Sequence, residues 1–372
     1  MKFKFMGIGA AGNKAAMELI NQGVADENDV ILVNSTNKDI PKDFNGKTII
    51  LSPDNNGCGK ERSIAKEYAI RTMKAGTFDN IFTEKDDSIL IVTSMEGGTG
   101  SGSSPIIGEY CSKVLGKNVH IVSFTGFEDD ARGLQNTIEF FQEINFDCDI
   151  QTIRNDAFLP AAGNNKFKAE IMANTEFANR TKVLIGMELI ESTQNIDDTD
   201  IFKVVSTTGY KTIEMLYFDE DLVDVEQFNK LCKQMIYNSK SLKSKNPGQI
   251  RLGVILNIKP ESEDAIDGSL SVITEAYGKP FEFFLHKQYD GKRQYIKFIS
   301  SGMKMPLDEV KAIHERYIKA TEAVDKNTDT FFSEIGKLGK KEEDEKFDMV
   351  RSNHRPGSKE NFFQKFETKP KK

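Results

Sequence analysis

The sequence predicts an α/β protein built on a doubly wound parallel sheet, and three observations lead to this prediction. The 372 residues are 38% hydrophobic and 29% charged, which is typical of a globular chain and excludes the disordered, collagen-like and membrane-spanning classes. Short apolar runs alternate with amphipathic stretches over residues 1–150. Two of these runs lead directly into glycine-rich turns. A chain of this length suits two domains.

The alternation defines the elements of the first domain, a nucleotide-binding domain that we expect to span residues 1–166. Strands are expected at residues 3–8, 30–33, 88–93 and 119–124. Amphipathic helices are expected at residues 13–22, 64–73, 104–115 and 134–143. Strands and helices at this spacing are joined by right-handed crossovers, which give a parallel sheet with helices on both faces.

A long central helix is expected to follow, from residue 167 to about residue 190, because small and apolar residues recur there at helical spacing. Its length of roughly 30–35 Å would link two domains, and we assign residues 167–192 to it. A smaller α/β domain is expected at 193–306, with strands at 249–258, 269–276, 280–285 and 295–299. Pro306, Asp308 and Glu309 mark the start of a long C-terminal helix at 307–338.

The C-terminal region differs in charge from the rest of the chain. Residues 337–372 hold eleven Lys or Arg and seven Asp or Glu, a balance of 11 − 7 = +4, whereas the whole chain carries −7. Composition leaves two interpretations open: an arm that binds an anionic partner, and a solvated terminus that maintains solubility. Residues 339–346 have too few apolar side chains to offset the entropy of ordering, so we expect a flexible basic tail at 339–372.

Cysteine and histidine usage excludes two kinds of site. The four cysteines and four histidines are dispersed and include no C-x-x-C pair, so we expect reduced structural thiols and neither disulfides nor a zinc site. The apolar run at 3–8 leads into glycines without a usable cleavage site, so it is interpreted as the first strand of a cytoplasmic protein. No apolar run approaches the ~20 residues that cross a bilayer, and no membrane partner is expected.

Residues 7–12 fit G-x-G-x-x-G between a predicted strand and a predicted helix. Glycines there let the backbone approach a phosphate, and the helix N-terminus supplies free N–H groups and a partial positive charge. The motif also fits NAD, but NAD binding needs an acidic residue at the end of the second strand. The sequence at that place is Val33-Asn34-Ser35-Thr36, so an NAD-dependent Rossmann enzyme is the less favoured alternative.

A second glycine cluster, residues 96–103, joins the strand at 88–93 to the helix at 104–115. Two such turns on one sheet can place two helix N-termini around one polyphosphate, with the hydroxyls of Thr99, Ser101 and Ser103 as extra donors. A flexible loop would not explain four glycines and three hydroxyls between apolar runs. The segment 57–61 only imitates a Walker A loop, because Glu61 replaces the Ser or Thr that binds Mg²⁺, although Lys60 could still cover a γ-phosphate.

These motifs together resemble the tubulin/FtsZ superfamily of GTP-dependent filament proteins. Residues 97–102 resemble its G-G-G-T-G-[ST]-G phosphate loop, with Glu96 in place of the first glycine. The family's other phosphate loops, its ribose segment and its guanine-contacting Asn-Asp pair are similar to residues 9–13, 34–37, 56–60, 127–132 and 154–156. The resemblance implies that GTP or GDP is bound by Gly9, Ala10, Ala11, Asn13, Asn34, Gly57, Gly59, Lys60, Gly97, Gly98, Thr99, Gly100, Ser101, Glu128, Arg132, Asn155 and Asn174.

Residues 195–200, Asn-Ile-Asp-Asp-Thr-Asp, resemble the N-x-D-x-x-D synergy loop of that family. The resemblance implies that Asn195, Asp197 and Asp200 are catalytic and polarise water at the γ-phosphate held by the next subunit. Hydrolysis would then depend on head-to-tail assembly, a contact that does not close and therefore makes a filament. From the residues alone, the same aspartates could also form a solvated loop that caps the helix beginning at Ile201.

The base pocket is predicted less sharply. Asn155 suits guanine, because a carboxamide pairs with both a donor and an acceptor edge. The second contact should come from the start of the central helix, where Asn174 and Asn179 compete and Asn174 has the better spacing to the synergy loop. Three side chains nearby are expected to face the core, with one of them able to stack on the base: Phe167, Met172 and Phe177. Mg²⁺ should accompany GTP, held mainly by phosphate oxygens and water and not by protein ligands.

The C-terminal region indicates the branch of the family. FtsZ would be expected to end in a flexible linker and a short apolar-basic peptide, and tubulin would be longer with an acidic tail. The long helix and lysine-rich tail here most resemble the TubZ-type tubulins of plasmids and phages, which segregate DNA through a DNA-binding adaptor. The resemblance implies that residues 339–372 engage such an adaptor on centromeric DNA. An FtsZ-like division ring protein is the alternative, and a non-hydrolysing filament protein is a third possibility.

Overall fold

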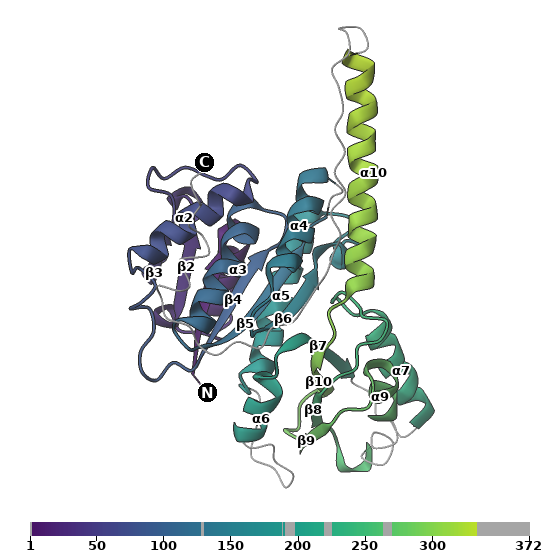
Figure 1. Cartoon of the computed structure of the whole chain (residues 1–372). Coiled ribbons are helices and arrows are strands. Elements are labelled where there is room, and N and C mark those ends of the chain that lie inside the picture. The colour runs from purple at the N-terminus through teal and green to yellow at the C-terminus, as the bar shows by residue number, and fades with distance from the viewer. Residues whose placement is uncertain are drawn as a thin grey trace.

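The computed structural model describes residues 2–127, 130–187, 189, 198–218, 225–262 and 270–332. Within these ranges the strands form one ten-stranded sheet in the order β3-β2-β1-β4-β5-β6-β7-β10-β8-β9. Helices cover both faces of its N-terminal half, and α5 runs between the two halves of the molecule (Figure 1). The predicted α/β class with a doubly wound parallel sheet is confirmed by this arrangement.

The N-terminal half contains the parallel part of the sheet. Its strands are β1 (Phe3–Ile8), β2 (Val30–Asn34), β3 (Lys47–Ile50), β4 (Ser88–Ser94), β5 (Asn118–Thr125) and β6 (Asp149–Arg154). Its helices are α1 (Gly9–Asn21), α2 (Arg62–Lys74), α3 (Gly98–Lys113) and α4 (Ala131–Glu143). The strand order reverses between β1 and β4, which pair in parallel, and ligands of such sheets bind at this switch point.

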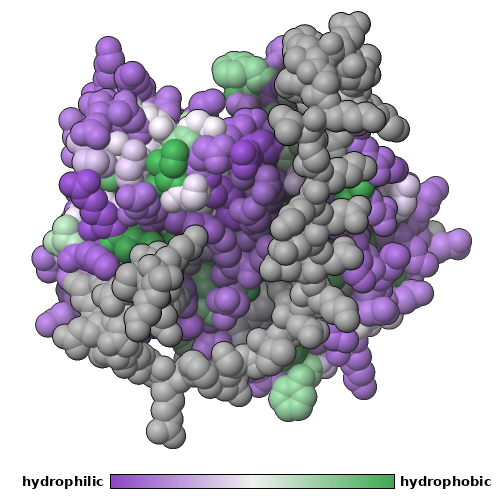
Figure 2. All heavy atoms as spheres, turned by 45° about the horizontal axis from the view of Figure 1, so that its top comes forward, coloured by the Kyte–Doolittle hydropathy of each residue, from purple (hydrophilic) through white to green (hydrophobic). Residues whose placement is uncertain are grey.

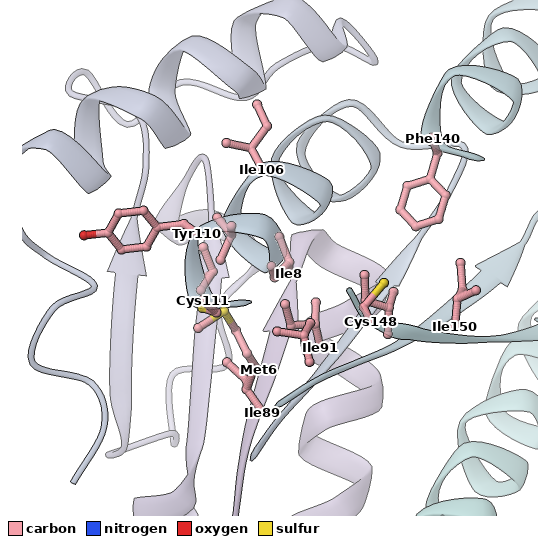
Figure 3. Close-up of a cluster of buried hydrophobic side chains, with 14 of the residues drawn as sticks. Met6, Ile8, Ile89, Ile91, Ile106, Tyr110, Cys111, Phe140, Cys148 and Ile150 are labelled. Atoms are coloured by element: carbon pink, nitrogen blue, oxygen red, sulfur yellow. The ribbon is translucent and has the colours of Figure 1, made fainter. Parts of the chain in front are cut away.

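Both faces of this half are buried, which explains the continuous apolar run of β4. Ile89 and Ile91 pack against Ile106 on the face covered by α2, α3 and α4 (Figure 3). Leu90 and Val92 belong to the cluster on the opposite face, with α1 and α5. Because successive side chains of a strand point to opposite faces, a strand covered by helices on both faces is apolar throughout.

All four cysteines are free and buried, as expected of structural thiols. Figure 3 shows Cys111 and Cys148 inside the core of the α2–α4 face. Burial raises the pKa of Cys111 to about 12, so this thiol stays protonated at neutral pH. Among the residues that the structure describes, no group of three His, Cys, Asp or Glu side chains could hold a metal ion.

The central helix α5 (Lys166–Leu184) is shorter than predicted, since we expected it to continue to about residue 190. Gly186 follows its end with φ +68°, a left-handed conformation that favours glycine. The backbone N–H of Met187 donates to the carbonyl of Lys182 at 3.0 Å, and that of Gly186 donates to Val183 at 3.2 Å. These two bonds form a Schellman motif, which ends the helix.

The second half adds four strands and three helices among the described residues: α6 (Asp198–Val205), β7 (Gly209–Phe218), α7 (Val225–Tyr237), β8 (Arg251–Asn257), α9 (Leu270–Tyr277), β9 (Glu282–Gln288) and β10 (Gln294–Met303). The predicted strand at 269–276 is wrong, because α9 occupies it with Val272 and Ile273 buried. The β-branched residues there favour a strand, but Leu270, Ile273 and Tyr277 follow helical spacing. Short 3-10 helices lie at η1 (Glu27–Asp29), η2 (Asn37–Asp39), η3 (Asn155–Phe158) and η4 (Pro260–Ser262).

A buried charged cluster joins the two halves where β6 pairs with β7. The Asp149 carboxylate lies 2.9 Å from the Lys211 ammonium and also contacts His120, and all three side chains are buried. Burial alone would raise the pKa of Asp149, but His120 and Lys211 outweigh it and lower that pKa. The strands β3, β6 and β7 were not predicted, and in β6 and β7 such buried polar residues obscure the apolar pattern of a strand.

The C-terminal helix α10 (Leu307–Phe332) packs against α4, where Ile313 contacts Leu134 and Ile138. Its 26 residues are about 39 Å long, twice the length of α4, so it extends well beyond the body of the molecule (Figure 1). Residues 333–338 of the predicted helix and the predicted tail at 339–372 lie outside the described residues. In the part of the chain that the structure describes, every helix is too short or too polar to cross a bilayer. Figure 2 shows a mostly hydrophilic face with small, separate apolar areas.

Candidate functional site

Two helix N-termini lie against each other at the carboxyl ends of β1 and β4. Helix α1 begins at Gly9 and α3 begins at Gly98, six residues earlier than predicted for the second helix. Gly9 has φ +78°, and a Cβ on it would lie 3.0 Å from the backbone nitrogen of Gly100. The glycines therefore bring two first turns, each with unpaired N–H groups and a partial positive charge, to one place. An anion with several phosphates fits this arrangement.

The segment around Lys60 closes this place from a third side. A Cβ on Gly98 would lie 2.8 Å from the Cα of Lys60, so the third predicted phosphate segment packs directly on the start of α3. By contrast, a Cβ on Gly57, Gly59 or Gly97 would meet no atom within 4 Å. Only glycine fits at residue 98, because the backbone of Lys60 lies against it. The open space beside Gly57, Gly59 and Gly97 leaves room for a ligand.

Hydroxyl groups join the second predicted phosphate segment, residues 34–37, to the fourth, residues 97–102. The side chains of Ser35 and Thr99 share a hydrogen bond of 2.8 Å. Asn34 is buried, and its Oδ1 accepts a hydrogen bond of 2.8 Å from the Ser35 backbone. Asn13 on α1 is also buried, and neither polar atom of its side chain has a hydrogen-bond partner. The residues predicted from the first, second and fourth segments therefore meet at one edge of the sheet.

Two of the three hydroxyls predicted as extra donors form hydrogen bonds within α3. Ser101 donates to the carbonyl of Gly97, and Ser103 donates to the carbonyl of Thr99 at 2.5 Å. Both serines lie inside the first turns of the helix, where such back-bonding to the residue four positions earlier is common. The two hydroxyls, predicted as extra donors to a phosphate, therefore donate within the helix in this structure, because α3 begins before them and not after them.

A pocket of about 310 Å³ lies beside the first turn of α1. Its lining includes Ala11, Lys14, Lys60, Asn155 and Asn174. The Oδ1 atom of Asn155 is buried without a hydrogen-bond partner. A buried carboxamide oxygen without a partner is costly, so a ligand that donates a hydrogen bond there would be stabilised. Ala10 belongs to the same first turn of α1.

The start of α5 resolves part of the base-pocket prediction. Asn174 lines the pocket and Asn179 does not. Phe177 is buried in the core as predicted. Phe167 is 66% exposed and Met172 is 36% exposed, so the prediction that they face the core is wrong. Ala169, Ala173 and Phe177, spaced four residues apart, form the buried face of α5, and Phe167 and Met172 lie on other faces of the helix.

The ribose segment is only partly described, because Glu128 lies outside the described residues. Arg132 is oriented toward Glu61, with 2.9 Å between a guanidinium nitrogen and Oε1, and it does not line the pocket. Asp130 caps α4 by accepting a hydrogen bond of 2.9 Å from Gly133. The same carboxylate binds the Lys60 ammonium at 2.8 Å, and this hydrogen bond lowers the pKa of Asp130.

Two supporting residues were missed by the sequence analysis. The Nδ2 atom of Asn136 on α4 donates to the carbonyls of Glu96 at 2.8 Å and Lys60 at 3.0 Å, which holds two of the predicted phosphate segments together. Arg62 is buried and donates to the carbonyl of Ser101 at 2.9 Å. The only sequence signal for Asn136 is a polar residue on the apolar face of a predicted helix, and this signal does not indicate which groups the side chain binds.

Of the predicted catalytic segment at 195–200, the structure describes residues 198–200, which lie at the opposite edge of the sheet. Asn195 and Asp197 lie outside the described residues, and Asp200 is on α6 with its carboxylate 3.5 Å from the Lys203 ammonium. A cavity of about 500 Å³ is lined by Asp87 and Asn118, which adjoin the amino ends of β4 and β5, and by Thr199 of α6. The helix that carries Asp200 is therefore at the amino edge, far from the glycine turns at the carboxyl edge (Figure 1).

Comparison with known proteins gives one family. Residues 2–163 match the Tubulin/FtsZ family, GTPase domain. The chain is 28% identical over 225 residues to the tubulin-like protein TubZ of Clostridium botulinum C phage, covering 59% of this chain and 60% of that protein. It is 24% identical over 237 residues to the tubulin-like protein CetZ1 of Haloferax volcanii, covering 57% and 58%. The match thus spans about 60% of the length of these curated relatives.

A similar fold is found among solved structures. The GTPγS-form protofilament of Bacillus thuringiensis serovar israelensis TubZ has a TM-score of 0.73 to this chain and 14% sequence identity. The similarity covers 90% of this chain and 95% of that one. At this identity the likeness shows that the fold is shared along nearly the whole of both chains.

Proposed function

We propose that this chain binds GTP, assembles into head-to-tail filaments and hydrolyses GTP between subunits. The match of residues 2–163 to the Tubulin/FtsZ family, GTPase domain, supports this proposal. The observation that carries the proposal is the division of the predicted site between two edges of one sheet. The glycine turns and the pocket with Asn155 lie at the carboxyl edge, and Asp200 lies at the amino edge. A subunit stacked on another would bring the two edges together.

In this proposal the carboxyl edge binds the nucleotide. The phosphates would lie on the first turns of α1 and α3. These turns are formed by Gly9, Ala10, Ala11, Asn13, Gly97, Gly98, Thr99, Gly100 and Ser101. The residues that would cover the phosphates are Asn34, Gly57, Gly59 and Lys60. Glu128 and Arg132 would contact the ribose, and Asn155 and Asn174 would contact guanine. The unpaired Oδ1 of Asn155 and the presence of both asparagines in one pocket support the assignment of the base.

The amino edge of the next subunit would supply the chemistry. Asn195, Asp197 and Asp200 would orient a water molecule against the γ-phosphate, and a carboxylate of Asp197 or Asp200 would accept its proton as the water oxygen bonds to phosphorus. The bond between the γ-phosphorus and the β–γ bridging oxygen would break, so that GDP and inorganic phosphate leave. Mg²⁺ would neutralise charge on the β- and γ-phosphates. Phosphate oxygens and water would mainly hold the ion.

The domain division that we propose follows from this mechanism. Residues 1–166 would bind GTP, 167–192 would link the domains, 193–306 would carry the activating loop, and 307–338 would lead to a basic tail at 339–372. We also propose that the chain is cytoplasmic and segregates plasmid or phage DNA, with the tail binding a DNA-binding adaptor on centromeric DNA. The lysine-rich composition of the tail and the 28% identity to a phage TubZ support this finer assignment.

The test is the dependence of phosphate release on protein concentration, with light scattering to detect assembly. Specific activity should be close to zero at low concentration and should rise together with scattering once filaments form. Specific activity that is constant from far below to far above the assembly threshold would overturn the shared site. A thermal-shift comparison tests the ligand, because GTP or GDP should stabilise the fold by RT ln(1 + [L]/Kd) and NAD should not.

A further inference from the structure

Glu96 stands between two cavities, at the position where the family's phosphate loop has its first glycine. One is the pocket of about 310 Å³ beside α1, and the other is a cavity of about 170 Å³ beneath α10. Glu96, Gly126 and Phe127 line both of them. A side chain in place of a glycine, directed between the proposed nucleotide pocket and the C-terminal helix, is not needed for the packing of α3, which begins two residues later.

The backbone of Glu96 is fixed, and its carboxylate lies against the neighbouring loop. Asn136 donates to the Glu96 carbonyl at 2.8 Å, which holds the backbone in place. A Cβ on Gly126 would lie 1.7 Å from an oxygen of the Glu96 carboxylate, so only glycine fits at residue 126 while Glu96 adopts this position. The backbone N–H of Gly126 hydrogen-bonds to the charged carboxylate.

The charges around Glu96 come from two sides. Asp130 and Lys60 face it from the nucleotide side, and Arg316 of α10 faces it from the other side. Burial and then the nearby Asp130 raise the pKa of Glu96 to about 7, against the opposing effects of Gly126, Lys60 and Arg316. The two cavities also bring further charged groups near it: Lys14, Lys166 and Glu170 on the nucleotide side, and Arg154, Asp156 and Glu309 beneath α10.

We propose that Glu96 is a positioning residue that couples the nucleotide pocket to α10. This inference rests on the proposed binding of GTP. In the free protein, Lys60 and Arg316 favour the charged form of the Glu96 carboxyl, although burial and Asp130 outweigh them. A triphosphate entering the pocket adds negative charge beside Glu96 and attracts Lys60, and both changes favour the protonated carboxyl. A protonated Glu96 attracts Arg316 less, so nucleotide binding weakens the electrostatic contact between Glu96 and α10. By thermodynamic reciprocity, the position of α10 then affects nucleotide affinity.

The proposal fixes the direction of a pH effect. Because the pKa of Glu96 is about 7 in the free protein and higher when the triphosphate is bound, binding takes up a proton. Nucleotide affinity must then be highest below pH 7 and must fall as the pH rises through 7. The phosphates titrate in the same range, so the effect of Glu96 has to be separated by comparison with a variant that lacks this carboxyl.

The experiment measures GTPγS affinity with Mg²⁺ between pH 6 and pH 8 for the full chain, Glu96→Gln and Glu315→Gln. Glu315 is an exposed carboxylate on α10 that lines neither cavity, so Glu315→Gln removes the same charge without touching the coupling. For a rise of about one pKa unit on binding, the wild type should lose about fivefold more affinity than Glu96→Gln over this range. Glu315→Gln should follow the wild type.

A second readout reports on α10 itself. Hydrogen exchange of the amides of residues 307–322, with and without GTPγS at pH 7, should change in the wild type and not in Glu96→Gln. Arg316→Met removes a cation at an exposed position of α10. The pKa of Glu96 should then rise, and the fall in nucleotide affinity should move to higher pH. This variant keeps the test valid even if Glu96→Gln does not fold. If the wild type and Glu96→Gln both bound GTPγS tightly and their affinities changed with pH in the same way, this inference would be overturned and the proposed function would not. No binding of GTPγS by the wild type would overturn the proposed function as well.

Discussion

The two edges of the N-terminal sheet are built differently. At the carboxyl edge, Gly9 packs on Gly100 and Gly98 packs on Lys60, so that backbone contacts fix three segments around one pocket. At the amino edge, a cavity of about 500 Å³ separates the loops before β4 and β5 from α6. The contrast suggests that one edge is complete within a single chain, whereas the other presents acidic side chains to something outside it. Binding and turnover should therefore respond differently to changes at the two edges.

The largest expected effect is on turnover and comes from Asp200→Ala at the amino edge. Removal of a group that orients water and accepts its proton should lower GTP turnover by about 10²–10⁴-fold, while nucleotide affinity and assembly remain. Stability should change little, because the Asp200 and Lys203 side chains are both partly exposed and such ion pairs contribute little. Phosphate release above the assembly threshold is the measurement.

The control for this variant is Glu67→Ala, which removes an exposed carboxylate from α2. It should leave turnover unchanged. If Asp200→Ala hydrolysed GTP at the wild-type rate in filaments, the amino edge would have no part in the chemistry, and the contrast between the edges would lose its functional meaning.

How far the sequence predicts each edge follows from what holds it together. The carboxyl edge could be predicted because its glycines and hydroxyls are local signals between apolar strands. The start of α3 at Gly98 could not, since glycine and serine are weak helix formers and only tertiary packing against Lys60 overrides them. The clamp by Asn136 was also inaccessible, because it joins residues far apart in the sequence.

The second half of the molecule shows the same limit more strongly. Strands β6 and β7 contain Asp149 and Lys211, whose charges make sense only when the two strands are paired. Helix α9 has the β-branched composition of a strand, but it buries Val272 and Ile273 against the sheet as a helix. In both cases the decisive contacts are long-range, so local periodicity is not sufficient.

A smaller effect is expected at the carboxyl edge, where Asn174→Ala and Asn179→Ala separate the two candidates for the guanine contact. Because Asn174 lines the pocket with Asn155, its loss should weaken GDP binding by about tenfold, equivalent to ~1.4 kcal/mol. Asn179→Ala, on the same helix but outside the pocket, should change GDP affinity by less than about twofold. Calorimetric titration with GDP, and with ADP as the specificity control, measures both. A larger loss for Asn179→Ala would reverse the assignment.

The smallest effect on either edge is expected from removing residues 339–372. This segment follows α10, which packs on α4 and not on α6, so its loss should leave GTP turnover and assembly within about twofold of the full chain. If, as we propose, the tail binds a DNA-binding adaptor through its lysines and arginines, deletion should abolish the pull-down of that adaptor. A variant with the tail residues in shuffled order separates sequence recognition from an effect of charge. Adaptor binding that depends only on charge would survive shuffling and would weaken steeply with salt. Retention of the adaptor by the truncated chain would show that the partner binds the body of the molecule and would remove the tail from the proposed function.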